Sequence, residues 1–170
     1  SAQDQRIAQL TDSLVGAPVS ELMRVSEGRT GYVRFLGTPP ATRIPVRTAA
    51  GATAEEQARD FLAQWGELFH EKSDSVGFST LRVEGNDRRS LVRLAQSYSE
   101  VPVYCAQVIV QVDPSGGIAC VLGDLMHDFE SLDTGALRIK PTIGADAAKQ
   151  AAIAQVAAAN PGAALDASAP

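Results

Sequence analysis

The clearest pattern in the chain is an alternation of apolar and polar side chains between residues 91 and 122. Three runs carry it, at residues 91–98, 103–112 and 118–122. A period of two is typical of strands that bury one face. Residues 113–117 read DPSGG, in which the proline presets φ at one turn position and the glycines accept positive φ. The pattern therefore predicts a three-stranded antiparallel β-meander.

The same alternation assigns side chains to the two faces of these strands. One face of the middle run is expected to hold Tyr104, Ala106, Val108, Val110 and Val112. The apolar face of the last run is expected to hold Ile118, Cys120 and Leu122. A turn centred on Ser115 places Cys120 opposite Val110, so that Cys105 lies on the other face. A disulfide between the cysteines is therefore disfavoured unless a bulge changes the register, and two free, buried thiols are expected.

Residues 53–69 are expected to form the main helix. Thr53 is a favourable N-cap, and Glu56 three residues later completes a capping box. Apolar side chains at three-and-four spacing form one wide face, which consists of Ala54, Ala58, Phe61, Leu62, Trp65, Leu68 and Phe69. This face is expected to pack on the meander, and shorter helices are expected near the two ends, at residues 4–15 and 146–159. The expected fold class is α+β, an antiparallel β-meander sheet packed against an amphipathic helix with a further short helix at each end.

Weaker signals fill the rest of the chain. Residues 19–26 and 31–36 are expected to form a hairpin, and residues 80–84 to pair with residues 91–98. Residues 73–79 are expected to be a loop. Residues 37–52 contain three prolines and are expected to be an extended connector. A last short strand is expected at residues 137–140.

Composition narrows the possible partners. The 170 residues carry a formal net charge of −5, which argues against a nucleic-acid surface, where a basic stripe would be expected. Four arginines do cluster around one turn, and a solvated face is the expected role for Arg82, Arg88, Arg89 and Arg93. No apolar run approaches the ~20 residues that cross a membrane, so no membrane span is expected.

Catalytic motifs are sparse. His70 and Glu71 begin like a zinc-protease helix, but Asp74 stands where the second histidine of H-E-x-x-H belongs. His127 is the only other histidine. The sequence also lacks G-x-S-x-G and a phosphate-binding glycine loop. No catalytic residue, metal ligand or cofactor is therefore expected in this chain, and the residues that contact a partner cannot be named from the sequence.

The first and second strands carry a family resemblance. The stretch QSYSEVPVYCA, followed by an alternating valine strand and the DPSGG turn, resembles the fungalysin/thermolysin propeptide (FTP) motif. The matching positions are Gln96, Tyr98, Val101, Pro102, Val103, Tyr104, Ala106, Asp113 and Gly116. The chain departs from the motif at Glu100 and Cys105, where the family usually has glycine. For Gln96 and Tyr98, either a structural role in the sheet or contact with a protease is consistent with the motif, and the structural role is favoured.

The resemblance implies a domain organisation and a function. Residues 1–52 would be an N-terminal helix, hairpin and connector, and residues 53–140 an FTP-like module. The stretch PTIGADAAKQAAIAQ resembles the opening of a PepSY domain, so residues 141–170 would be the incomplete start of a PepSY-like module. The chain would be the non-catalytic propeptide of a secreted or periplasmic zinc metalloendopeptidase, thermolysin-like or fungalysin-like. It would act as intramolecular chaperone and temporary inhibitor of that protease's catalytic domain, with zinc and calcium only in the protease. The alternative is a stand-alone extracytoplasmic protein-binding or protease-inhibitor module with no attached enzyme.

Overall fold

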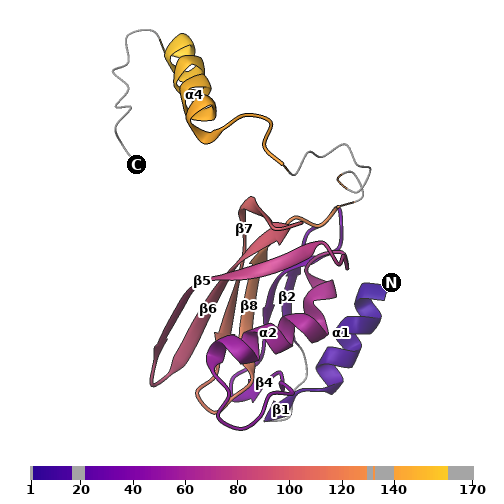
Figure 1. Ribbon diagram of the computed structural model, residues 1–170. Helices are drawn as coiled ribbons and strands as arrows, with labels where there is room; N and C mark the ends of the chain where they lie inside the picture. Colours follow the sequence, from indigo (N-terminus) through magenta and orange to yellow (C-terminus); the bar gives the residue numbers. More distant parts are fainter. Residues whose placement is uncertain (1, 17–21, 130–131, 133–139, 161–170) are drawn as a thin grey trace. The chain divides into compact units, whose positions relative to one another are not determined.

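The computed structural model describes residues 2–16, 22–129, 132 and 140–160. Contacts divide the chain into two units, Ser1–Thr134 and Gly135–Pro170. The first unit consists of a six-stranded antiparallel sheet with helices on one side, so the predicted α+β fold class is confirmed (Figure 1). The predicted module boundary within this unit, at residues 52/53, stays a prediction.

The sheet is built around the predicted meander. Its strand order is β2 (Met23–Ser26), β3 (Val33–Gly37), β8 (Ile118–Asp124), β7 (Val101–Val112), β6 (Arg89–Tyr98) and β5 (Val76–Asn86). The last four of these strands follow one another along the chain, each antiparallel to the next. The β2–β3 hairpin was predicted, and it joins the sheet beside β8 rather than forming a separate ribbon.

Helix α2 (Ala54–Trp65) covers one face of the sheet. Thr53 caps it as predicted, because its hydroxyl accepts a hydrogen bond from the Glu56 N–H at 3.2 Å while the Glu56 carboxylate accepts one from the Thr53 N–H at 2.7 Å. The predicted helix continued to residue 69, but a 3-10 turn, η1 (Gly66–Leu68), replaces its last part. The tighter turn directs Leu68 and Phe69 into the core, where both are fully buried.

The core lies between α2 and the inner face of the meander. Phe61 is fully buried, and its ring meets that of Phe69 edge to face at 6.1 Å between centroids. The strands contribute fully buried side chains from one face, which are Val92, Leu94, Val108, Val110 and Val121. Helix α1 (Ala2–Asp12) adds Leu10 to the same core.

Other predicted boundaries also differ from the structure. Helix α1 ends at Asp12 rather than at residue 15, because the Ser13 N–H and hydroxyl both donate to the Leu10 carbonyl and close the helix. Residues 15–16 form β1 (Val15–Gly16), which pairs with β4 (Thr42–Arg43) in the connector. Residues 76–79 belong to β5 rather than to a loop, since pairing with the second half of β6 holds a Gly- and Ser-containing stretch extended.

A β-bulge in β8 overturns the predicted faces of that strand. Val112 pairs with Ile118 but Gln111 pairs with Cys120, so Ala119 is an extra residue whose carbonyl accepts a hydrogen bond from the Thr38 N–H at 2.9 Å. The bulge inverts the alternation. Val121 is therefore buried, whereas Leu122, predicted to be in the core, is 50% exposed.

The same bulge places Cys120 opposite Gln111, not opposite Val110. Both cysteines are free thiols, as predicted, but neither is fully buried: Cys120 is half-buried and Cys105 is exposed. Burial raises the pKa of the Cys120 thiol.

The second unit contains α4 (Ala145–Ala159), which agrees with the helix predicted at residues 146–159. None of its residues is buried. The strand predicted at residues 137–140 falls, except for its last residue, outside the described residues. Within the described part of the chain, no helix is long and apolar enough to cross a membrane.

Candidate protein-binding surface

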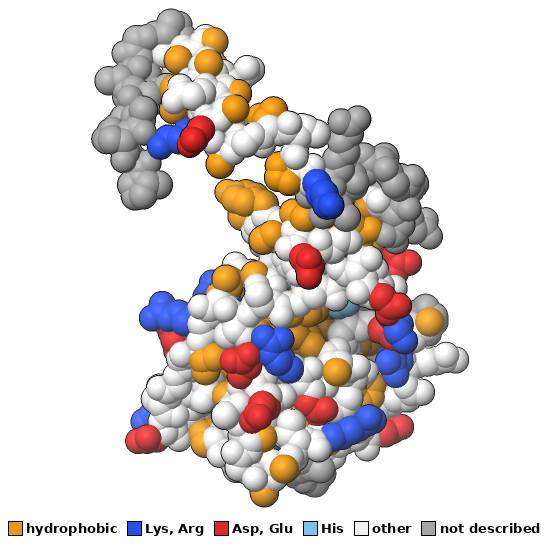
Figure 2. Space-filling view, in the orientation of Figure 1, with side chains coloured by type: hydrophobic (Ala, Val, Ile, Leu, Met, Phe, Trp, Pro, Cys, Tyr) orange, Lys and Arg blue, Asp and Glu red, His pale blue; other side chains and the backbone are white. Residues whose placement is uncertain are grey.

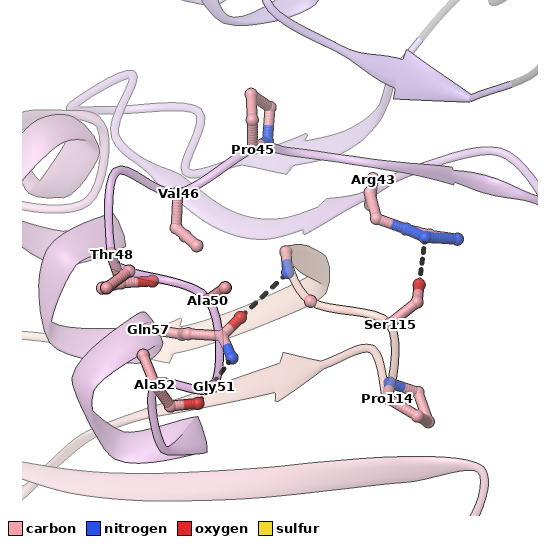
Figure 3. A pocket seen from close by; sticks show the side chains of 13 residues that line it. Arg43, Pro45, Val46, Thr48, Ala50, Gly51, Ala52, Gln57, Pro114 and Ser115 are labelled. Atoms are coloured by element: carbon pink, nitrogen blue, oxygen red, sulfur yellow. Dashed lines mark hydrogen bonds between the residues drawn. The ribbon is translucent and has the colours of Figure 1, made fainter.

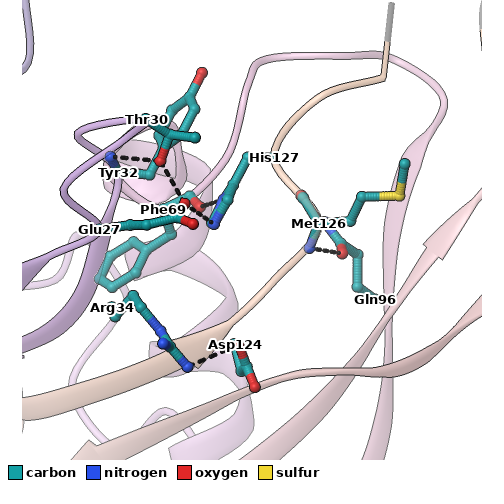
Figure 4. Close-up of polar contacts among 9 residues, drawn as sticks. All are labelled: Glu27, Thr30, Tyr32, Arg34, Phe69, Gln96, Asp124, Met126 and His127. Carbon is teal, nitrogen blue, oxygen red and sulfur yellow. Dashed lines mark hydrogen bonds and ion pairs between the residues drawn. The ribbon is translucent and has the colours of Figure 1, made fainter. Parts of the chain in front are cut away.

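Gln96, in β6, forms side-chain hydrogen bonds with the segment that follows β8. Its side chain is fully buried, its Oε1 accepts a hydrogen bond from the Met126 N–H at 2.9 Å, and its Nε2 donates to the Met126 carbonyl at 3.1 Å (Figure 4). The side chain thus pairs with both backbone groups of one residue, as a neighbouring strand would. These contacts agree with the structural interpretation of Gln96, a backbone hydrogen bond.

Tyr98 also has a structural position. It is 6% exposed, and its ring stacks on that of Phe129 with 5.4 Å between centroids and 6° between planes. The stacking holds the residues after β8 against the end of β6. Contact of Gln96 or Tyr98 with another protein stays a prediction.

The β6–β7 hairpin requires an unusual backbone at two positions. Tyr98 pairs with Val101, so Ser99 and Glu100 form a two-residue turn, with φ of 46° and 68°. Two successive positive φ values are typical of a type I′ turn, in which glycine and asparagine are favoured. Cys105 has a φ of 59°, also in the left-handed region.

Cys105 lies within a large bulge of β7. Ala95 pairs with Gln107 and Ser97 with Pro102, so the four residues 103–106 lie opposite Gln96 alone. The bulge releases the side chain of Gln96 toward Met126 and inverts the alternation of β7.

Tyr104 projects from this bulge and is 94% exposed. It was predicted to share one face with Ala106, Val108, Val110 and Val112, and this is wrong for Tyr104, because the other four residues are buried in the core. Three other motif positions lie in β7 near the hairpin. Pro102 pairs with Ser97 of β6. Val101 is 41% exposed, and Val103 is half-buried.

The remaining motif positions form the β7–β8 turn beside a pocket of about 560 Å³ (Figure 3). The Asp113 carboxylate accepts a hydrogen bond from the Ser115 hydroxyl, and this contact lowers the pKa of Asp113. Gly116 and Gly117 have φ of 93° and 89°, which confirms the reason for expecting glycine in this turn. Gln57 connects the turn to α2, since its Oε1 accepts a hydrogen bond from the Gly117 N–H at 2.9 Å. Arg43 also contacts the turn, since its Nη1 donates a hydrogen bond to the Ser115 hydroxyl, so side chains that line this pocket hold the turn in place.

The two histidines take part in contacts that hold the fold. His70 is 9% exposed, its Nδ1–H donates to the Glu71 carbonyl at 2.6 Å, and burial lowers the pKa of His70. The Nδ1–H of His127 donates to the Phe69 carbonyl at 2.8 Å (Figure 4). In the described part of the chain, no group of three or more His, Cys, Asp or Glu residues could hold a metal ion.

Contacts around His127 join the β2–β3 hairpin to the segment after β8. The Nε2 atom of His127 lies 3.4 Å from the Glu27 carboxylate, and Tyr32 stacks on its ring at 4.9 Å. A hydrogen bond from the Thr30 hydroxyl lowers the pKa of Glu27, to which His127 and Arg29 contribute less. This arrangement holds two chain segments against each other.

The face of the sheet opposite α2 carries a row of apolar side chains that are exposed or half-buried. In its central cross-strand row, Val25 pairs with Phe35, Phe35 with Leu122, and Leu122 with Ile109. The row then continues through Arg93 to Arg82. We call this surface the open face.

The helix-bearing side of the sheet differs from the open face in its charged side chains. Figure 2 shows acidic and basic side chains intermixed over the helix-bearing side of the sheet-containing unit. The arginines of the β5–β6 hairpin are all exposed, as predicted for a solvated cluster. The sequence did not reveal that Arg82 and Arg93 extend an apolar row.

Comparison of the chain with protein-family models, with curated proteins and with solved structures found no match. The candidate site therefore rests on the structure alone. It consists of the open face and the exposed β6–β7 hairpin.

Proposed function

We propose that this chain is the non-catalytic propeptide, or the N-terminal part of it, of a secreted or periplasmic zinc metalloendopeptidase of the thermolysin-like or fungalysin-like kind. It acts as an intramolecular chaperone and temporary inhibitor of the protease's catalytic domain. Zinc and calcium belong to that catalytic domain, and this chain needs no cofactor.

The observation that carries the proposal is the backbone at the two departures from the FTP motif. The motif has glycine where this chain has Glu100 and Cys105, and these residues have φ of 68° and 59°. Glycine is the residue that adopts such angles without steric cost. A chance similarity of letters would not place both glycines of the motif at left-handed positions, so this agreement supports the resemblance.

The buried Gln96 gives further support. A glutamine inside a sheet is costly unless both ends of its amide are paired, and here both ends bind the backbone of Met126. The motif thus has a physical basis in the glutamine, the bulge that frees it and the left-handed residue within that bulge.

The histidines support a non-catalytic role. His70 and His127 each donate a hydrogen bond from Nδ1 to a backbone carbonyl, and these contacts hold the fold. A folding unit of this kind acts through its surface.

Binding alone accounts for both proposed activities. A domain that binds the native protease, and not the unfolded chain, stabilises the native form by mass action. Attachment through a short flexible linker supplies an effective concentration of about millimolar, so even modest affinity is sufficient before cleavage. After cleavage the same contact becomes bimolecular and inhibition becomes reversible by dilution.

The test begins with the coding sequence after Pro170. An H-E-x-x-H helix with a downstream glutamate is expected. The catalytic domain encoded there is then refolded with and without the separately purified chain, and its peptidase activity is measured while the chain is titrated. We expect a higher refolding yield and progressive inhibition. Equal yield and equal activity at a large excess of chain would refute the proposal.

The alternative is a stand-alone extracytoplasmic module that binds proteins or inhibits proteases. The exposed apolar open face is the observation that keeps it in consideration, because such a face serves any protein partner. A stop codon soon after Pro170 would favour the alternative.

A further inference from the structure

We propose that the open face of the sheet is the docking surface of this chain, and that its partner presents an apolar strip that ends in carboxylates. The inference rests on the proposed function only for the identity of that partner, the protease catalytic domain. The surface itself follows from the exposure, shape and charge of the sheet.

Large apolar side chains are exposed on the open face. Met23, Val25 and Leu122 are 53%, 58% and 50% exposed. Cross-strand pairing places them on the same face as Phe35 and Ile109, which are half-buried. No described helix of Ser1–Thr134 covers this face, because α1 and α2 lie on the opposite side (Figure 1). Apolar side chains that are contiguous across several strands mark an interaction surface.

A glycine determines the shape of the open face beside Phe35. Phe35 lies over Gly37, where a Cβ atom would approach the Phe35 ring to 3.0 Å. Glycine therefore lets an aromatic ring lie low across the strand.

The open face is also hollowed at two places along the apolar row, one near Phe35 and one near Arg93. A hollow of about 260 Å³ next to Phe35 includes Met23 and Cys120 in its lining. A second hollow, of about 420 Å³, is lined by Leu81, Arg82, Glu84, Leu91, Arg93 and Ile109. Such hollows can receive side chains that project from a partner.

The arginines at one end of the row indicate the chemistry of the partner. Arg82 forms an ion pair with Glu84, but Arg93 donates only to the neutral Gln107 amide oxygen, at 3.1 Å. Among the described residues Arg93 has no carboxylate partner. Residues 82–93 contain four arginines against two carboxylates, in a chain whose net charge is −5. An acidic group on the partner would complement this end of the row.

The order of the row argues against a second copy of this chain as the partner. Two copies related by a two-fold axis at the middle of the row would pair Leu122 with Ile109. The same axis would place Phe35 against Arg93 and Val25 against Arg82. Arginine heads would then lose water without gaining a carboxylate, which is costly. A different polypeptide with a terminal acidic group fits both ends of the row.

The experiment compares substitutions on the two faces of the same sheet. Leu122→Glu places a charge in the middle of the open face. Val83→Glu is the matched control, because Val83 is 48% exposed and pairs with Val92, so it projects on the opposite face. Circular dichroism and thermal unfolding first establish that each variant is folded.

Inhibition of the catalytic domain encoded after Pro170 is then measured for each variant. We expect Leu122→Glu to raise the inhibition constant at least tenfold and Val83→Glu to change it less than twofold. Arg93→Glu is expected to weaken inhibition and to reduce its dependence on salt between 50 and 300 mM, since a screened attraction is lost. If Leu122→Glu does not fold, Val25→Glu takes its place at the exposed edge of the row.

The outcomes separate this inference from the proposed function. Wild-type inhibition that Leu122→Glu leaves unchanged would overturn the docking surface while the function stands. Absence of wild-type inhibition would overturn the function, and the inference with it. A wild-type dimer in sedimentation experiments that Leu122→Glu dissociates would show that the occupant is a second copy, which also contradicts the inference.

Discussion

The two faces of this sheet are built from the same strands but differ in what their apolar side chains contact. On the inner face, Val92, Leu94, Val108 and Val110 are fully buried under α2. On the open face, Leu122 and Val25 remain at least half exposed. The comparison separates residues that the fold needs from residues that the fold leaves available. Substitutions of the same kind on the two faces therefore have different expected effects on stability.

The largest effect is expected from Phe61→Ala on the inner face. Phe61 is fully buried, so its truncation removes packing and leaves a cavity, at a cost of about 3–5 kcal/mol. Leu122→Ala on the open face is the comparison, with an expected cost of about 1 kcal/mol since half of its surface is already in water. Urea unfolding measures both. Equal costs would mean that the open face is covered in solution.

The next effect is expected from Gln96→Leu. The substitution keeps the approximate size but leaves the Met126 N–H and carbonyl without their partners, at a cost of about 2 kcal/mol. Gln107→Leu on the open face is the control, with an expected change below about 0.5 kcal/mol. Denaturant unfolding again gives the values. A neutral Gln96→Leu variant would show that this amide does not hold the segment after β8.

His70 is buried on the inner side of the sheet, and its titration makes the free energy of unfolding depend on pH. Burial lowers its pKa below the ordinary 6.5, so the unfolded chain binds the proton more readily than the folded chain does. This contribution to the free energy of unfolding is present above the unfolded pKa and declines as pH falls from about 6.5 through the folded pKa. His70→Gln should flatten the stability profile between pH 7 and pH 5. An unchanged profile would mean that His70 is solvated in the folded protein.

A smaller change, this time a gain in stability, is expected at the β6–β7 hairpin. Glu100→Gly and Cys105→Gly relieve the left-handed backbone, and each should stabilise the protein by about 0.5–1 kcal/mol. Ser79→Gly, in β5 and without a positive φ, is the control and should destabilise by a similar amount. Thermal unfolding shows the sign in each case. Destabilisation by both glycine substitutions at the hairpin would remove the main support for the family assignment.

The sequence predicts those parts of the fold that depend on local pattern. Alternation identified β6, β7 and the start of β8, and the capping box located the first residue of α2 correctly. These features depend only on residues that are close in the sequence, either through the alternation of a strand or through the capping box of a helix. Local pattern therefore sufficed for the fold class.

The open face could not be predicted because it depends on tertiary pairing. Ala119 bulges where Thr38, from a distant segment, binds its carbonyl, and this bulge moves Leu122 from the predicted core to the surface. Phe35 joins Leu122 only after the β2–β3 hairpin docks beside β8. The bulge at Cys105 likewise exposes Tyr104. The sequence contains one indication of this bulge, which is that the FTP motif usually has glycine at the position of Cys105.

The most direct measurement is hydroxyl-radical footprinting of this chain, alone and mixed with the protease catalytic domain that is proposed as its partner. Met23 and Phe35 report on the open face, and Val83 reports on the opposite face. The account predicts that Met23 and Phe35 are oxidised in the free chain and protected in the complex, while oxidation of Val83 is unchanged. Protection of Val83 with full oxidation of Met23 and Phe35 would contradict it.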